Sequence, residues 1–281
     1  MRHSTADGAQ DAVRLLASLT SLSPLALGDD ARHLIEAGVD GIHVDIGDGH
    51  FVPFLTFGLT LISSLADSVE ARIEVHLMVD DPEAWIAEVA KLRVARVWFH
   101  LEATRHPWRV ASLIRGAGMQ AGLAVNAVTP IAVLQTLGRA VDAVNLLGTD
   151  HDFRSGDPQL DGMIERVRAA RAILGQAIRL EVDGGVDATN AAALVRAGAD
   201  DLVVGRAICG RPDWTSAVQE LRVSIVAASN MRTRRGSRGE SGSTSCPPVV
   251  RSRLTSRCST GAVSQEPGVG RPLSFWRWRA A

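Results

Sequence analysis

Residues 41–50 read GIHVDIGDGH, a short β-branched run that closes with polar residues and glycines. A run of this length and composition predicts a strand over residues 41–46. Side chains alternate between the two faces of a strand, so His43 and Asp45 are expected on the same face. A comparable run, EVDGG at residues 181–185, ends a second predicted strand at Asp183. Both runs therefore place ionisable side chains at strand ends.

The same pattern continues on either side of these runs. From residue 17 to residue 222, short apolar runs alternate with segments of helical period. The predicted strands are 15–22, 41–46, 72–78, 96–100, 120–126, 143–147, 178–183 and 201–205. The predicted helices are 29–37, 58–66, 82–92, 107–116, 130–138, 158–174, 188–197 and 212–222. Gly38, Gly118 and Gly198 follow predicted helix ends, where a left-handed residue is favoured.

Eight strand-then-helix units predict the α/β class and a single (β/α)8 TIM barrel in place of a doubly wound sheet. No GxGxxG follows the first predicted strand, as it usually does in dinucleotide-binding sheets. In barrels, function collects at the carboxyl ends of the strands, where His43, Asp45, His76 and Asp183 are expected. Two imidazoles and two carboxylates that converge there can bind a divalent metal and supply two proton carriers.

Composition limits the classes of protein to which the chain can belong. Of its 281 residues, 46% are hydrophobic, which is enough for a sizeable core. No run of 18 apolar residues is present, so we expect no membrane span, and residues 1–16 make a poor signal peptide. The cysteines at 209, 246 and 258 have no CxxC spacing. We therefore expect a cytoplasmic protein with reduced thiols.

Charge divides the chain into an acidic body and a basic tail. Residues 223–281 contain ten Arg, two Glu and neither Lys nor Asp, which gives +8; the whole chain has a net charge of −1, so residues 1–222 carry −9. We expect an N-terminal extension (1–16), a barrel domain (17–222) and a disordered, low-complexity C-terminal extension (223–281). The acidic body opposes nucleic-acid binding, and a small molecule is the ligand expected there. The aromatic and basic residues 275–279 could contact a membrane or nucleic acid, although an unselected extension is the simpler interpretation.

Six segments of the body together resemble the ribulose-phosphate 3-epimerase family. They are HVDIGDGHFVP (43–53), EVHLMV (74–79), HLEA (100–103), NAVTP (126–130), EVDGGV (181–186) and VVGRAI (203–208). The resemblance runs from about residue 20 to 222, nearly the whole body. It implies a (β/α)8 barrel that carries out a metal-assisted inversion at carbon 3 of a ketose phosphate, and relatives that are commonly homo-oligomers.

The resemblance also implies roles for individual residues. His43, Asp45, His76 and Asp183 would be the metal ligands, with Zn as the expected ion and Fe, Mn or Co as alternatives. Asp45 and Asp183 would double as the acid/base pair. The chemistry suits such a set, because a carbon-3 proton must leave one face of the sugar and return to the other.

The chain departs from the family pattern near the reacting carbon. The family has a serine in the strand 1 segment PSIL, and here Pro24 is read onto that position, with Ser21 or Ser23 as substitutes. Met78 is kept among the family's methionines. Gly47 stands at a second methionine position, where it is expected to leave room for a bulkier substrate.

The phosphate site departs further. The family's glycine-rich PGFGGQ becomes GTDHDFRSG at residues 148–156. We expect the phosphate contacts of that segment to be replaced by backbone amides after the strands 178–183 and 201–205 and by the side chains of Arg154 and Arg206. The predicted substrate-binding residues are Met78, Gly184, Gly185, Gly205, Arg206 and Arg154. His100 and Glu102 are expected to support the site.

Two other interpretations stay open. A lyase of a related phosphate-binding barrel, such as hexulose-phosphate synthase, carries an Asp-x-Lys-x-x-Asp segment on strand 3. Strand 3 has none here, and Lys91 is the chain's one lysine, which disfavours lysine-dependent chemistry. A non-catalytic barrel that binds a sugar phosphate is the second alternative. The sequence does not decide which ketose phosphate is bound.

Overall fold

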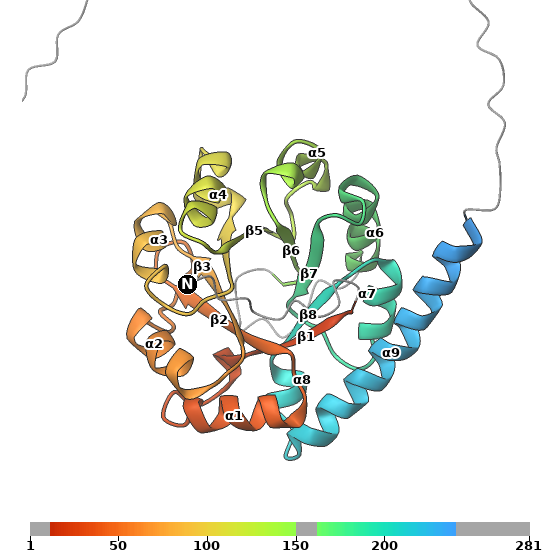
Figure 1. Ribbon diagram of the computed structural model, residues 1–281, viewed down its shortest axis with the longest axis horizontal. Coiled ribbons are helices and arrows are strands. Elements are labelled where there is room, and N and C mark those ends of the chain that lie inside the picture. The colour runs from red at the N-terminus through yellow and green to blue at the C-terminus, as the bar shows by residue number, and fades with distance from the viewer. Residues whose placement is uncertain (1–11, 150–161, 240–281) are drawn as a thin grey trace, which may run out of the picture. The chain divides into compact units, whose positions relative to one another are not determined.

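The computed structural model describes residues 12–149 and 162–239, with side chains as far as Met231. Within this part of the chain, parallel strands close into a barrel in the order β1 to β8, each paired with its sequence neighbours (Figure 1). The strands are β1 (Arg14–Ser18), β2 (Gly41–Gly47), β3 (Arg72–Met78), β4 (Arg96–His100), β5 (Gln120–Val125), β6 (Ala143–Leu147), β7 (Arg179–Asp183) and β8 (Asp201–Val204).

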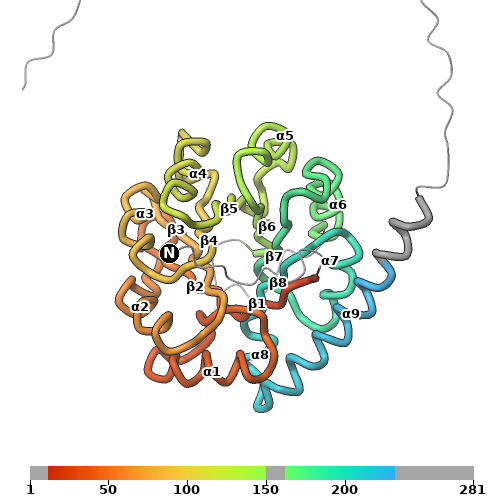
Figure 2. Tube along the Cα trace, in the orientation of Figure 1, coloured from red at the N-terminus to blue at the C-terminus, as the bar shows by residue number. Residues whose placement is uncertain are grey.

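Helices surround this barrel as an outer ring (Figures 1 and 2). They are α1 (Leu27–Ala37), α2 (Leu59–Ser68), α3 (Glu83–Val89), α4 (Pro107–Gly116), α5 (Leu134–Leu137), α6 (Met163–Leu174), α7 (Ala191–Ala197), α8 (Arg206–Cys209) and α9 (Trp214–Gly239). Short 3₁₀ turns follow β1 (Leu19–Ser21) and β4 (Leu101–Ala103) and flank α5 (Ile131–Val133 and Gly138–Ala140). The predicted (β/α)8 barrel is confirmed.

The alternation of β2 explains how the barrel separates its apolar and polar residues. Ile42, Val44 and Ile46 belong to the hydrophobic core, which lies between the strands and the helices. His43 and Asp45 point to the other side of the strand and are also buried, at the barrel interior. The strand is therefore buried on both faces, as parallel strands are.

Charged residues fill the interior below the carboxyl ends of the strands. Arg96, Glu74, Glu181 and Asp201 come from four strands and have at most 1% of their surface exposed. Nη1 of Arg96 lies 3.3 Å from Oε1 of Glu74, 3.1 Å from Oδ2 of Asp201 and 3.9 Å from Oε2 of Glu181. Burial opposes ionisation of Glu74, but Arg96 and Arg72 lower its pKa to about 2. The guanidinium of Arg96 thus lies within ion-pair distance of three buried carboxyl groups.

Several predicted boundaries differ from the structure. β1 begins at Arg14, inside the expected extension, and ends at Ser18; residues 19–21 form a 3₁₀ turn, although apolar residues continue to Leu22. The helix predicted over 130–138 is split into three short pieces.

The helix predicted to end at residue 222 continues to Gly239. Leu221, Ile225 and Ala228 recur at helical spacing and are buried in the core, so this face extends the helix into the segment expected to be disordered. Residues 1–11, 150–161 and 240–281 lie outside the described part, and with them the rest of the predicted tail.

A glycine in β5 gives a direct test of the packing inside the barrel. A Cβ at Gly122 would lie 2.1 Å from Cε3 of Trp98, which is fully buried and donates a hydrogen bond to Glu74 at 2.9 Å. We expect Gly122→Ala to lower the free energy of unfolding by about 2 kcal/mol through overpacking, as measured by urea denaturation. Gly116→Ala, where an added Cβ meets nothing within 4 Å, is the control. Equal denaturation midpoints for the two variants would contradict this packing.

Candidate functional site

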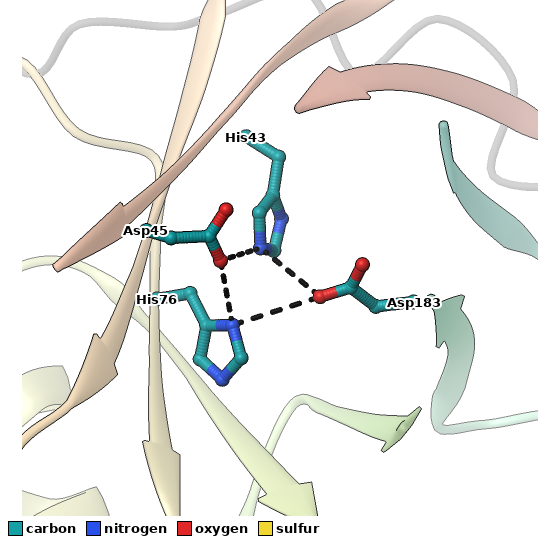
Figure 3. A group of neighbouring side chains, drawn as sticks. All are labelled: His43, Asp45, His76 and Asp183. Carbon is teal, nitrogen blue, oxygen red and sulfur yellow. Dashed lines mark hydrogen bonds and ion pairs between the residues drawn. The ribbon is translucent and has the colours of Figure 1, made fainter. Parts of the chain in front are cut away.

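Four ionisable side chains converge at the carboxyl end of the barrel (Figure 3). His43 and Asp45 come from β2, His76 from β3 and Asp183 from β7. Asp45 and His76 are register partners on neighbouring strands, and Nδ1 of His76 lies 3.0 Å from Oδ1 of Asp45. Nε2 of His43 lies 3.3 Å from Oδ1 of Asp45 and 3.6 Å from Oδ2 of Asp183. The sequence predicted all four, and the structure brings them together.

These side chains fit a divalent cation. One ligand atom from each lies within 4.8 Å of the others, a spacing that a central ion with bonds of about 2.0–2.2 Å can bridge. Both ring nitrogens of His43 are buried and have no hydrogen-bond partner in the described part of the chain. A buried imidazole whose nitrogens make no hydrogen bond is costly unless something else binds them. Two imidazoles and two carboxylates are donors that zinc and related ions accept.

The electrostatics of the group also favour a cation. Burial opposes a charge on His43, but Asp45, Asp183 and Glu181 raise its pKa to about 10. Burial raises the pKa of Asp183, and the charge of Asp45 adds to this effect. Burial acts in the same direction on Asp45, but His43 and His76 reverse it and lower the pKa of that carboxyl. The site therefore stabilises positive charge between two carboxyl groups in different environments.

Ser18 was missed by the sequence interpretation. It is the last residue of β1, paired in register with His43, and its Oγ donates to Oδ2 of Asp45 at 3.1 Å. The placement of the strand 1 serine at Pro24 was wrong, because Pro24 is exposed beyond the 3₁₀ turn. Had the first strand been predicted to end at residue 18, Ser18 would have been placed at the strand end beside His43 and recognised as a candidate site residue.

The residues predicted to bind substrate lie around the same barrel end. Met78 closes β3 and is buried. Gly184 and Gly185 follow β7 with φ of 97° and 74°, left-handed values that favour glycine. Gly205 and the exposed Arg206 follow the neighbouring strand β8.

Two other expectations about the substrate site have different outcomes. Arg154 lies outside the described residues. Gly47 leaves no extra room, because a Cβ there would lie 2.9 Å from both the backbone oxygen of Phe54 and Cγ2 of Val52. The expectation of added space for a bulkier substrate was therefore wrong.

A second acidic group lies deeper in the barrel. His43, Glu74 and Glu181 also bring potential ligand atoms within 4.8 Å of one another. Arg96 already lies 3.3 Å from Oε1 of Glu74 and 3.9 Å from Oε2 of Glu181, so its guanidinium supplies the positive charge there. His43, Asp45, His76 and Asp183 are therefore the better candidates for holding a metal ion.

None of the helices in the described ranges is long and apolar enough to cross a bilayer.

Comparison with known proteins identifies relatives over most of the chain. Residues 14–209 match the model of the ribulose-phosphate 3-epimerase family. Ribulose-phosphate 3-epimerase 1 of Cupriavidus necator is 38% identical over 229 residues, which cover 78% of this chain and 95% of the relative. Ribulose-phosphate 3-epimerase of Escherichia coli K12 is 35% identical over 216 residues, which cover 76% of this chain and 96% of the relative.

Solved structures share the fold at lower identity. A 3-hexulose-6-phosphate synthase aligns with a TM-score of 0.59 and 21% identity, over 75% of this chain and 99% of that structure. Orotidine 5'-phosphate decarboxylase from Pyrococcus horikoshii aligns with a TM-score of 0.56 and 18% identity, over 75% and 99%. At these identities the likeness shows the barrel fold alone.

Proposed function

Because the chain belongs to the ribulose-phosphate 3-epimerase family, we propose that it inverts carbon 3 of a ketose phosphate, with D-ribulose 5-phosphate and D-xylulose 5-phosphate as the first substrates to test. The observation that carries this proposal is the convergence of His43, Asp45, His76 and Asp183 at the barrel mouth. These four side chains include the types of group that the family's reaction requires.

In this proposal the two carboxyl groups exchange protons with the substrate. Asp45 stands on β2 and Asp183 on β7, on two sides of the imidazoles (Figure 3). One takes the carbon-3 proton and the other returns a proton to the opposite face, so each can act as base or acid according to the direction of reaction. The hydrogen bond from Ser18 holds Asp45 in one orientation.

His43 and His76 would hold a divalent ion together with these carboxylates. When bound, such an ion polarises the substrate carbonyl and stabilises the negative charge of an enediolate. Zinc is our first expectation for this donor set, with iron, manganese and cobalt as alternatives.

The phosphate would bind over the ends of β7 and β8. Backbone amides of Gly184 and Gly185 follow β7 at this end of the barrel, and Gly205 follows the adjacent strand β8. Arg206 is exposed and has no ion pair with any residue in the described ranges, so its guanidinium is available for a phosphate. Arg154 is proposed as a second contact, and Met78 as an apolar contact with the sugar.

Lysine-dependent lyase chemistry has little support. Lys91, the one lysine, is exposed beyond the end of α3 and pairs with Glu88. It is not on a barrel strand, where a Schiff-base lysine would meet a substrate. Cytoplasmic location and a homo-oligomeric state stay predictions.

The reaction is tested with a panel of tetrulose, pentulose and hexulose phosphates in deuterated water, followed by NMR. We expect deuterium at carbon 3 of a pentulose phosphate, loss of exchange with a chelator, and recovery with added zinc. Absence of exchange on every sugar with the zinc-loaded protein would contradict the proposal. Sugar-phosphate binding without exchange would favour the non-catalytic barrel.

Ser18→Ala is expected to slow this exchange about tenfold. The change removes one hydrogen bond to a carboxylate, an interaction worth about 1.5–3 kcal/mol, while zinc binding should persist. Initial rates of deuterium incorporation at saturating zinc measure the effect. Ser23→Ala, at an exposed position beyond β1, is the control and should match the parent protein. Equal rates for Ser18→Ala and the parent would show that this hydrogen bond has no part in catalysis.

A further inference from the structure

A chain of hydrogen-bonding groups extends from His76 away from the proposed cation. Nε2 of His76 lies 2.8 Å from Nε2 of His100, which is completely buried at the end of β4. The two ring planes differ by 17° and their centroids are 5.0 Å apart, so the nitrogens meet edge to edge. Nδ1 of His100 lies 3.4 Å from Oε2 of Glu102.

The position of Glu102 is itself fixed. Its other oxygen, Oε1, accepts from the backbone N–H of Asn126 at 3.0 Å and from the hydroxyl of Thr129. Burial opposes its ionisation, but the hydrogen bonds from His100, Thr129 and Asn126 lower its pKa to about 2. Glu102 is thus a carboxylate that only accepts hydrogen bonds.

Neutral imidazoles allow two arrangements of hydrogens along this chain: either Nδ1 of His76 donates to Asp45, or Nδ1 of His100 donates to Glu102. A cation held by Nδ1 of His76 selects the second arrangement, in which Nδ1 of His100 carries the hydrogen that faces Glu102. Nε2 of His100 is then an acceptor, and the hydrogen shared at 2.8 Å belongs to Nε2 of His76. Nδ1 of His76 is left with a lone pair, directed toward Asp45 at 3.0 Å and Asp183 at 3.6 Å. That lone pair is what a metal ion needs from histidine.

We propose that His100 and Glu102 are positioning residues that fix the tautomer of His76, so that Nδ1 of His76 is available to a divalent cation. The proposal rests on the proposed function only in requiring that a cation binds at this site. Phe51, from the segment after β2, packs against the His100 ring with centroids 4.7 Å apart and limits its rotation. The contact with Phe51 keeps the accepting nitrogen aligned with His76.

Paired substitutions of His100 separate hydrogen bonding from packing. His100→Gln keeps an oxygen able to accept from His76, whereas His100→Leu fills similar space without an acceptor. Zinc affinity of the full-length, zinc-depleted protein is measured by competition with a chromogenic chelator. We expect His100→Leu to bind zinc roughly 10–100-fold more weakly, as is usual for loss of a partner behind a ligand, and His100→Gln to stay near the parent value. Unchanged affinity in His100→Leu, or equal loss in both variants, would overturn the proposal.

Nitrogen-15 NMR of the histidine rings tests the parent protein without a substitution. In the zinc-loaded protein we expect hydrogens on Nε2 of His76 and on Nδ1 of His100. A hydrogen on Nδ1 of His76, or failure of the parent protein to bind zinc, would overturn the proposal. Zinc binding with this tautomer but without exchange on any ketose phosphate would contradict the proposed function alone.

Discussion

Asp183→Asn should lose carbon-3 exchange by about 10²–10⁴-fold, because an amide of the same shape cannot carry the proton. We expect the same loss for Asp45→Asn, since in the proposed reaction each carboxyl group serves one face of the sugar. Both residues are also proposed cation ligands, so zinc content is measured on each variant at saturating zinc. Deuterium incorporation from both epimers then gives the exchange rates.

The control for these variants is Asp213→Asn. Asp213 is exposed just before α9, and its Oδ1 accepts a hydrogen bond from the backbone N–H of Ser216 at the start of that helix. The Asp213→Asn substitution should leave the rate of carbon-3 exchange unchanged. If Asp45→Asn and Asp183→Asn both retained the parent rate, two-carboxylate proton transfer would be excluded.

Arg96→Met is expected to give the largest loss of stability, about 3–5 kcal/mol in the free energy of unfolding. Methionine is apolar, so Glu74, Glu181 and Asp201 would lose the guanidinium that lies within 4 Å of each carboxyl group. Urea denaturation near neutral pH measures the loss. The matched control is Arg93→Met: Arg93 makes a 3.8 Å surface ion pair with Asp67, and its loss should cost less than about 1 kcal/mol. Similar small losses in both variants would contradict the role of Arg96.

The Arg96→Met effect should depend on pH with a definite sign. In the parent protein the pKa of Glu74 is about 2, below its usual value of 4.5. The stability that this ionised carboxyl contributes is therefore present above about pH 4.5 and is lost as pH falls toward 2. The destabilisation by Arg96→Met should become smaller over the same pH range, because a protonated Glu74 carries no charge for the guanidinium of Arg96 to stabilise. A destabilisation that stays constant from neutral pH to the acid limit would count against this cause.

Strand periodicity predicted that the four side chains of the candidate metal site lie at strand ends, because the relevant facts are local. His43 and Asp45 share a face by alternation, and the runs that end in His76-Leu77-Met78 and in Asp183 mark other strand ends. A closed parallel barrel brings such ends to one mouth whatever their separation in sequence. That is why residues as far apart as 43 and 183 could be assigned to one site.

Strand and helix ends depended on packing that the sequence pattern does not contain. Apolar residues continue past Ser18, so β1 was extended too far and the serine beside Asp45 was overlooked. The composition of the tail concealed Ile225 and Ala228, which continue the buried face of α9. The open space expected at Gly47 is filled by residues of the following loop, Val52 and Phe54, a contact made only in the fold.

The charged interior was unexpected for a related reason. Glu74, Arg96, Glu181 and Asp201 are spread over 128 positions of sequence, and their pairing depends on four strands meeting inside the barrel. In the sequence alone, each of these residues looks like an ordinary polar residue of a strand. Oε1 of Glu181 also lies 3.7 Å from Nδ1 of His43, so this charged layer borders the proposed cation site.

Anomalous diffraction from crystals of the zinc-loaded protein tests the central claim most directly. We predict a single strong peak per chain, about 2.0–2.2 Å from Nε2 of His43, Nδ1 of His76 and one carboxylate oxygen each of Asp45 and Asp183. A peak elsewhere in the barrel, or none at these four residues under saturating zinc, would contradict the account.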